Sequence, residues 1–405
     1  MDRIEIISPV HVGTGKKIEA PSYYREGDGT DTYRYNFLDI LSQLPPNVFT
    51  DQRFLNQLKK GQKSKKELYR YLDRYVDYTK LSPMYRLYDD NTDDISDLSY
   101  DVNEQIKDLD VPYIPGSSIK GALINSWMYY LLKSNFNNSK LQVKDNMEKI
   151  VYKKVKNPTI VDFLYYDGRK HDAFIKDLQS CIVCRDIHFK QMEVLESHRI
   201  GSGKKRDGDQ PLGYCECIQS GQASEEQFFF VDEAKKARIQ ATLDRTLDRY
   251  FSKDMDEQER KRIKTRYNNI LGVFTKKMFL KSCTAFTQDI LSVEKESSIV
   301  MLYNKYSNLN QFVNQLSSQI KLDKDNKKYV AYLRIGNSTN YFSKSISYLF
   351  KTKQPELFNE YFDRVFSPST RGNTKANKFT LPKTRTIYSS YDKNYLPGFI
   401  KIEYD

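Results

Sequence analysis

His11 is the residue of this 405-residue chain best placed for acid–base chemistry, because it lies beside a glycine-containing turn. It ends a run rich in β-branched residues and precedes Gly13 and Gly15, so a strand followed by a turn is predicted. An imidazole at such a turn could act as a general base in RNA cleavage. We favour the alternative interpretation, a histidine at a strand end that hydrogen-bonds or stacks.

The rest of the sequence carries no established catalytic signature. It has no Walker loop, HExxH or GxSxG motif and no paired-carboxylate pattern, and the other three histidines have no partner pattern. Asp186 stands alone in a strand-like segment, which is typical of a structural hydrogen-bond acceptor. The sequence therefore favours a binding protein without a cofactor and predicts no catalytic residue.

Five cysteines in a chain without an export signal indicate free thiols. Cys181 and Cys184, together with Cys215 and Cys217, could in principle supply four zinc ligands. The first pair would point to opposite faces of a strand, however, and the second pair lacks the turn glycines of a zinc knuckle. We therefore expect buried or half-buried thiols and no metal site.

Residues 113–123 predict a strand end, a tight turn and the start of a helix. The central Pro-Gly pair suits a turn in which glycine adopts a φ that other residues resist, and Ser117 or Ser118 is expected to cap the helix. The first helical turn would offer free N–H groups, hydroxyls and Lys120 to an anion such as phosphate. The alternative is a capped helix with a solvent-exposed lysine. The apolar residues that follow at helical spacing are Ile119, Leu123, Trp127 and Leu131.

The composition favours a polyanionic partner over a small acidic substrate. The net charge is +12, and 31 Tyr and 22 Phe accompany the lysines and arginines, a combination that suits stacked RNA bases and paired phosphates. The alternative is a lysine-rich surface that maintains solubility. Because the chain has no run of about 18 apolar residues and begins in a strand-like pattern, we expect a cytoplasmic protein without membrane contact.

The order of strand-like and helical patterns predicts two α+β halves, residues 1–225 and 226–405. The first contains a charged helical insert at about 47–110, in which a basic run precedes an acidic run. The second carries long helical patterns, including one over 268–295.

Two loops and a C-terminal segment carry further binding candidates. A glycine-rich hairpin loop over 201–208 contains three cations, and a strand over 329–335 ends in a polar loop that begins with glycine. The segment from 371 to 385 has five basic residues and no acidic one. The residues singled out here are Lys204, Lys205, Arg206, Gly336 and Arg385.

Four segments, taken in order, resemble the RAMP superfamily of CRISPR-associated proteins. They are Ser-Pro-Val-His-Val-Gly-Thr-Gly (8–15), Tyr-Ile-Pro-Gly-Ser-Ser-Ile-Lys-Gly-Ala-Leu (113–123), Tyr-Leu-Arg-Ile-Gly (332–336), and Pro-Lys-Thr-Arg (382–385) with Pro-Gly-Phe-Ile-Lys-Ile (397–402). The order is most similar to the fifth-subunit family of type III-A (Csm) effector complexes. No single segment is specific, and the insert departs from the family pattern.

The resemblance implies two ferredoxin-like, RRM-related units, the first with the charged insert and the second with added helices. It implies a non-catalytic subunit that binds crRNA, caps its 3′ end, and supports crRNA maturation and antiviral defence against foreign nucleic acid. The implied partners are crRNA, target RNA, the adjacent backbone RAMP subunit, other Csm subunits, and host nucleases that trim the 3′ end.

Matching by position also implies a set of RNA-binding residues: His11, Gly13, Gly15, Ser117, Ser118, Lys120, Gly336, Thr384 and Arg385. We expect Lys120, the cations of the 201–208 loop and Arg385 to contribute to the RNA path. Two alternatives stay open. One is a crRNA-processing RAMP endoribonuclease with His11 as its base, and the other is a RAMP subunit of a Cmr-type complex.

Overall fold

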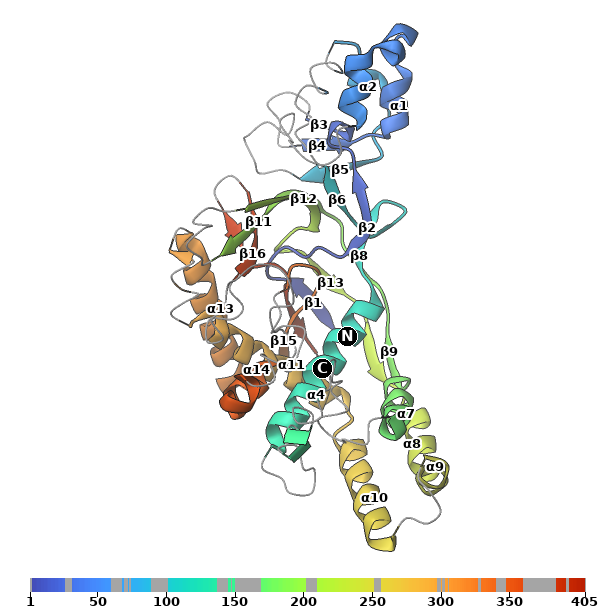
Figure 1. The fold of residues 1–405 in the computed structure, drawn as a ribbon, viewed down its shortest axis with the longest axis vertical. Coiled ribbons are helices and arrows are strands. Elements are labelled where there is room, and N and C mark those ends of the chain that lie inside the picture. The colour runs from blue at the N-terminus through green and yellow to red at the C-terminus, as the bar shows by residue number, and fades with distance from the viewer. Residues whose placement is uncertain are drawn as a thin grey trace.

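A computed structural model shows a mixed helix and sheet fold, which confirms the predicted α+β class. Figure 1 shows a lobe at the top, a central body with the larger sheets, and a group of helices at the bottom. The residues that the structure describes are 2–25, 31–59, 68, 72, 74–88, 101–136, 145–146, 148–149, 169–201, 210–250, 256–296, 300, 303–304, 306–326, 329–339, 347–359, 384–390 and 393–404.

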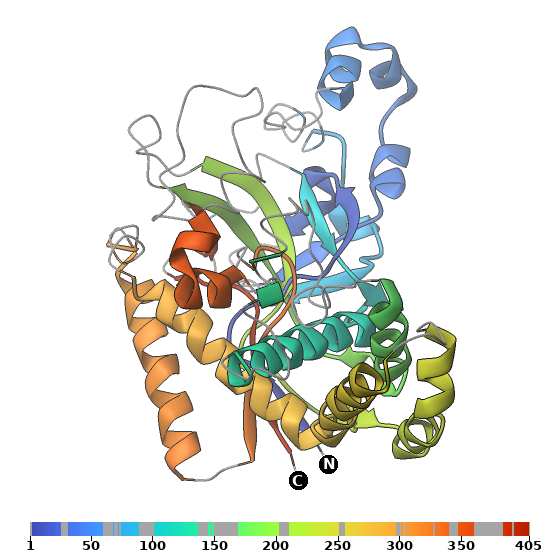
Figure 2. The ribbon, with the colours of Figure 1, turned by 60° about the horizontal axis from the view of Figure 1, so that its bottom comes forward.

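An antiparallel four-stranded sheet forms one half of the body. Its order is β13 (Ala223–Glu225), β1 (Arg3–Ile6), β18 (Phe399–Glu403) and β15 (Val330–Arg334). Helices α4 (Gly116–Ser134) and α11 (Lys276–Glu294) pack against each other and bury the apolar side chains of this sheet (Figure 2). The predicted apolar face of α4 is confirmed, since all four of its residues are buried.

A six-stranded sheet forms the other half of the body. Its order is β17 (Asn394–Tyr395), β16 (Thr384–Ser389), β11 (Met192–Gly201), β12 (Gln210–Ile218), β6 (Val102–Gln105) and β2 (Gly13–Ile18). Both large sheets combine strands from either side of residue 225, and the domain boundary placed there stays a prediction. A cluster of apolar residues from α13 (Ser307–Asp325), β15 and β16 packs between elements of the two sheets.

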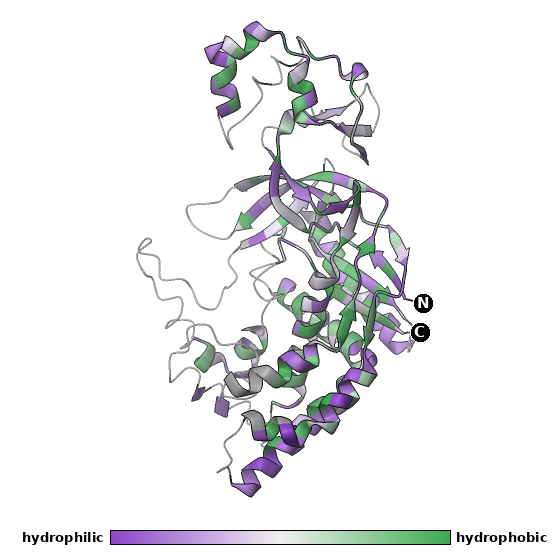
Figure 3. Ribbon diagram, turned by 90° about the vertical axis from the view of Figure 1, so that its right-hand side faces the viewer, coloured by the Kyte–Doolittle hydropathy of each residue, from purple (hydrophilic) through white to green (hydrophobic). Residues whose placement is uncertain are grey.

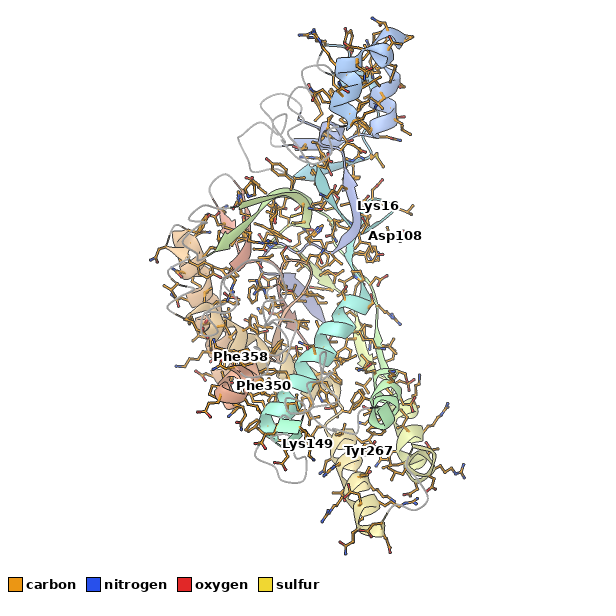
Figure 4. All side chains as sticks on the ribbon, in the orientation of Figure 1. Lys16, Asp108, Lys149, Tyr267, Phe350 and Phe358 are labelled. Atoms are coloured by element: carbon orange, nitrogen blue, oxygen red, sulfur yellow. The ribbon has the colours of Figure 1, made fainter. Side chains whose placement is uncertain are left out.

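Smaller sheets connect the body to the start of α4. One has the order β10 (Ile187–His188), β8 (Val111–Ile114), β7 (Lys107–Asp108), and the other pairs β14 (Phe229–Val231) with β9 (Ile182–Cys184). Beside α11 lies α14 (Ser347–Lys353), where Phe350 packs edge-on against Phe358 at 5.8 Å between ring centroids (Figure 4).

The lobe has its own sheet and its own apolar core. The sheet order is β3 (Tyr23–Arg25), β4 (Asp31–Arg34), β5 (Tyr85–Tyr88), and the core extends from Tyr35 to Tyr78 through α1 (Phe37–Ser42) and α2 (Gln52–Lys59). The lobe therefore begins well before the expected insert boundary at 47. Residues 102–105 belong to the large sheet as β6, and the acidic residues 89–100 lie outside the described residues.

Helices at the end opposite the lobe are α7 (Arg169–Gln179), α8 (Glu233–Ala241), α9 (Leu243–Tyr250) and α10 (Glu257–Gly272). Phe174 stacks on Tyr267 with ring centroids 3.9 Å apart, which joins α7 to α10. Figure 3 shows both hydrophilic and hydrophobic segments along the helices at this end, and α10 buries Ile263, Tyr267, Ile270 and Leu271. None of the described helices is long and apolar enough to cross a bilayer.

Candidate nucleic-acid interface

Three loops from distant parts of the chain interlock above the four-stranded sheet. Asn337 N donates to His11 O at 2.8 Å, and Gly398 N donates to Pro9 O at 2.9 Å. Gly336 has a φ of +94°, and a Cβ there would lie 2.7 Å from His11 O. Only glycine fits this position, because both the backbone conformation and the neighbouring carbonyl exclude a side chain.

A pocket of about 230 Å³ opens beside these loops. It brings residues of the first glycine loop next to the loop that follows β15. Its lining residues are His11, Gly13, Gly15, Lys16, Asn103, Glu104, Ser197, Leu212, Cys215, Asn337, Ser338 and Tyr388. Figure 4 shows Lys16 on β2, below the lobe.

The pocket combines donors with little steric obstruction. Lys16 is exposed, and the side-chain amide of Asn337 supplies a further hydrogen-bonding group, whereas Asn103 Nδ2 already donates to Tyr214 O at 2.9 Å. The expected turn over residues 13–17 is instead the edge strand β2, with a register shift between Gly13 and Lys17 and a φ of +84° at Gly15. The strand thus carries a local bulge at the pocket.

His11 is held as a neutral side chain in the pocket wall. It is only 4% exposed, and its Nδ1 lies 2.6 Å from Glu216 O, so Nδ1–H donates and Nε2 is left as an acceptor. Burial lowers the pKa of His11 despite that hydrogen bond. A Cβ on Gly13 would lie 2.8 Å from His11 Nε2, so Gly13 leaves room for the ring.

A buried carboxylate beneath the pocket fixes the lobe to the body. Glu216 on β12 accepts hydrogen bonds from Tyr23 Oη at 3.0 Å and Tyr85 Oη at 2.5 Å, both from the lobe sheet. Lys107 Nζ lies 2.6 Å from the same carboxylate, and Gln105 N donates to it at 3.0 Å. The sequence alone did not indicate Glu216, because each of these four partners is at least 109 residues away along the chain.

The start of α4 lies where the sequence predicts it, but it is capped differently. The N-cap is Pro115, which makes no side-chain cap, so the expected capping by Ser117 or Ser118 is wrong. Gly116 N instead donates to Asp186 Oδ1 at 2.7 Å, which confirms Asp186 as a structural acceptor. Gly116 does not have a positive φ; it is glycine because a Cβ would lie 2.5 Å from Cys184 O.

The side chain of Lys120 makes a hydrogen bond within the fold. Its Nζ donates to Ile182 O at 2.9 Å, which joins α4 to β9. Ser117 is exposed and Ser118 is half-buried. Contact of these three residues with RNA stays a prediction.

The sequence of this chain matches the RAMP superfamily family model over residues 3–385. The chain belongs to the RAMP superfamily. Its fold is similar to a chain of a Csm–crRNA–target RNA ternary complex from a type III-A CRISPR–Cas system, with a TM-score of 0.61, 16% identity and complete coverage of both chains. It is also similar to the Csm5 protein of T. onnurineus, with a TM-score of 0.53, 17% identity, and coverage of 88% of this chain and 95% of that one. No curated protein sequence matches significantly.

Arg385 of this RAMP protein is not available to RNA, which corrects the expectation from its C-terminal motif. It is 1% exposed, and its Nε lies 2.7 Å from Glu294 Oε2. Glu294 also accepts from Tyr303 Oη at 2.7 Å and pairs with Arg334 Nη1 at 3.3 Å. Although burial opposes its ionisation, the two arginines hold the pKa of Glu294 below its usual value.

The predicted basic hairpin of the RAMP fold has its two strands, β11 and β12, paired up to Arg199 and Gln210. Lys204, Lys205 and Arg206 lie outside the described residues. Thr384 begins β16 opposite Gly201, at the root of this hairpin.

The four cysteines considered as zinc ligands lie in two places, Cys215 and Cys217 on β12, Cys184 at the end of β9, and Cys181 directly before β9. Cys215 and Cys217 are buried on β12 with their Sγ atoms 3.8 Å apart, while Cys181 is buried and Cys184 half-buried at β9. Burial raises the pKa of Cys184 to about 12. Within the described part of this RAMP chain, no group of three or more His, Cys, Asp or Glu could hold a metal ion.

Proposed function

We propose that this RAMP protein is a crRNA-binding structural subunit of a type III-A CRISPR–Cas complex that caps the crRNA 3′ end. It would support crRNA maturation and defence against foreign nucleic acid without itself catalysing a reaction. The observation that carries the proposal is the fold similarity over the entire length of both chains to a component of a Csm–crRNA–target RNA complex. The net charge of +12 supports a nucleic-acid partner.

The finer architecture and the partners belong to the same proposal. We infer two ferredoxin-like units, at 1–225 with the charged insert and at 226–405 with added helices. The partners would be the crRNA 3′ region, target RNA, the adjacent backbone RAMP subunit, other Csm subunits and 3′-trimming nucleases, in the cytoplasm.

The RNA path would run over the pocket and the basic hairpin. A Cβ on Gly15 would meet nothing within 4 Å, so a sugar–phosphate backbone could approach closely there, and Lys16 supplies charge at the rim. Gly13 and Gly336 remain candidate contacts, although the space beside each is taken by His11. His11, Ser117, Ser118 and Lys120 remain candidate contacts, whereas Arg385 is excluded by its burial.

Filter binding of crRNA at several salt concentrations tests this path. We expect Lys16→Ala, and separately Lys204, Lys205 and Arg206 changed together to Ala, to weaken binding and to reduce the salt slope by roughly 0.7 for each lost phosphate contact. Lys264→Ala is the matched control, because Lys264 lies on α10 and pairs with Asp244 at 2.7 Å. Unchanged affinity and salt slope in both test variants would contradict the proposal.

The absence of catalysis is tested separately. His11 is hydrogen-bonded and nearly enclosed, which favours a structural role over that of a general base. Incubation with repeat RNA in EDTA should give no cut. A single cut that His11→Ala abolishes would replace the proposal with a RAMP endoribonuclease, and Cmr-type subunits co-purifying with the chain would reassign the complex.

A further inference from the structure

Strand β13 is an unpaired edge of the four-stranded sheet among the described strands. Its pairing with β1 uses alternate residues, since Glu226 N donates to Asp2 O at 3.1 Å and Ile6 N donates to Gln222 O at 2.9 Å. In an antiparallel pair, the residues between such positions direct their backbone groups away from the partner strand. The N–H and C=O groups of Ala223 and Glu225 therefore face outward, and both residues are exposed.

A groove of about 600 Å³ runs along this edge. Its other wall consists of Val111, which is 42% exposed, and the segment 188–191. The side chain of Gln222 holds that wall in place, because Oε1 accepts from Lys190 N at 2.9 Å and from Gln191 N at 2.8 Å, and Nε2 donates to Gln191 O at 2.6 Å. The groove is thus preformed by hydrogen bonds.

The chemistry of the groove fits a polypeptide better than RNA. Two outward N–H and C=O pairs, one at every second residue, match the hydrogen-bonding pattern of an added β-strand. Glu225 and Glu226 give this edge a negative end, in contrast to the overall charge of +12, and Lys190 is on the facing wall. The two carboxylates disfavour a phosphate backbone at their end of the groove and would attract a basic side chain.

We propose that the β13 edge receives an extended strand from a neighbouring protein subunit of the effector complex. The docking strand would place an apolar side chain against Val111 and a Lys or Arg beside Glu225 and Glu226. This inference rests on the proposed function, because it requires assembly with other subunits.

Amide hydrogen exchange on the full chain, alone and within the co-expressed complex, tests the docking edge. The amides of Ala223 and Glu225 should exchange rapidly in the chain alone and slow by about tenfold or more on assembly. The Ser224 amide, which faces β1, should exchange slowly in both states.

Co-purification of two Ala223 variants is the second test. Ala223→Pro removes one outward donor and leaves the hydrogen bonds to β1 intact. It should therefore abolish co-purification with the other subunits while crRNA affinity is unchanged. Ala223→Thr keeps the N–H and should assemble normally.

The following outcomes would overturn the inference. Protection caused by crRNA alone would assign the groove to nucleic acid, and protection that grows with the concentration of the isolated chain would assign it to a second copy. Assembly without protection, or normal assembly of Ala223→Pro, would overturn this inference alone. Failure of the wild-type chain to join the complex or bind crRNA would overturn the proposed function as well.

Discussion

His11 supports the fold and lines the candidate interface at the same time. Its ring donates to Glu216 O, its carbonyl accepts from Asn337 N, and its edge lies in the pocket wall. Burial favours the neutral imidazole and lowers the pKa of His11, although the hydrogen bond to Glu216 O acts in the opposite direction.

Acid should therefore destabilise the protein through His11. The pKa of His11 in the folded chain is below 6.5, so the unfolded chain binds the proton first as the pH falls. The neutral imidazole contributes fully to the free energy of unfolding above about pH 6.5. This contribution is lost as the pH falls from there toward the lowered pKa of the folded chain.

Urea unfolding at about pH 7.5 and about pH 5.5 should show that acid lowers the free energy of unfolding less in His11→Asn than in wild type. The exposed His188→Asn is the control, and an equal loss in all three proteins would contradict the role of His11.

Residue roles were predictable where the sequence pattern is local. Asp186 as a hydrogen-bond acceptor and the apolar face of α4 follow from neighbouring residues, and both are confirmed. The role of Arg385 was not predictable, because its partner Glu294 is 91 residues away and a basic stretch is equally typical of an RNA surface. The pocket could be foreseen only in part, from Gly13 and Gly15 beside His11.

At the level of elements, the two glycines of α4 differ in whether the structure leaves room for a side chain. A Cβ on Gly116 would meet Cys184 O at 2.5 Å, whereas one on the exposed Gly121 would meet nothing within 4 Å. The first glycine allows α4 to approach β9, and the second has only a conformational cost.

Alanine substitutions should therefore have opposite effects on stability. Gly116→Ala should lower the free energy of unfolding by about 1–3 kcal/mol, because the backbone of α4 or β9 must move. Gly121→Ala should raise it by about 0.5–1 kcal/mol, because alanine favours the helix. Urea unfolding of both variants measures the difference, and equal effects would contradict the packing argument.

Element boundaries were less predictable than element types. The strand predicted over 329–335 is β15, but the helix predicted over 268–295 is divided into α10 and α11. Thr275 caps α11 by accepting from Met278 N at 3.3 Å, and this cap interrupts an otherwise continuous apolar pattern. The strand β2 was missed because its glycines are typical of a turn.

In the whole molecule, the Glu294 network connects the two large sheets. Arg334 comes from β15 in one sheet and Arg385 from β16 in the other, and both bind the same buried carboxylate on α11. Loss of either arginine would leave Glu294 buried with too little positive charge.

Arg385→Ala should therefore lower the free energy of unfolding by about 3–5 kcal/mol, which is typical of breaking a buried ion pair. Arg3→Ala is the control; its pair with Glu403 spans 3.5 Å between half-exposed side chains and should contribute no more than about 1 kcal/mol. Urea unfolding measures both. A small effect of Arg385→Ala on stability, combined with a reduced salt slope for crRNA, would restore Arg385 to the RNA path.

The pairing of β1 with β18 at the centre of the four-stranded sheet has a consequence during synthesis on the ribosome. Phe399 N donates to Ser8 Oγ across 391 residues, and Gly398 N closes the loop below the pocket. A growing chain can form neither contact until residues 398 and 399 have left the exit tunnel, so β1 has an open edge until then. A chain that ends before residue 398 would lack both contacts that close the loop below the pocket.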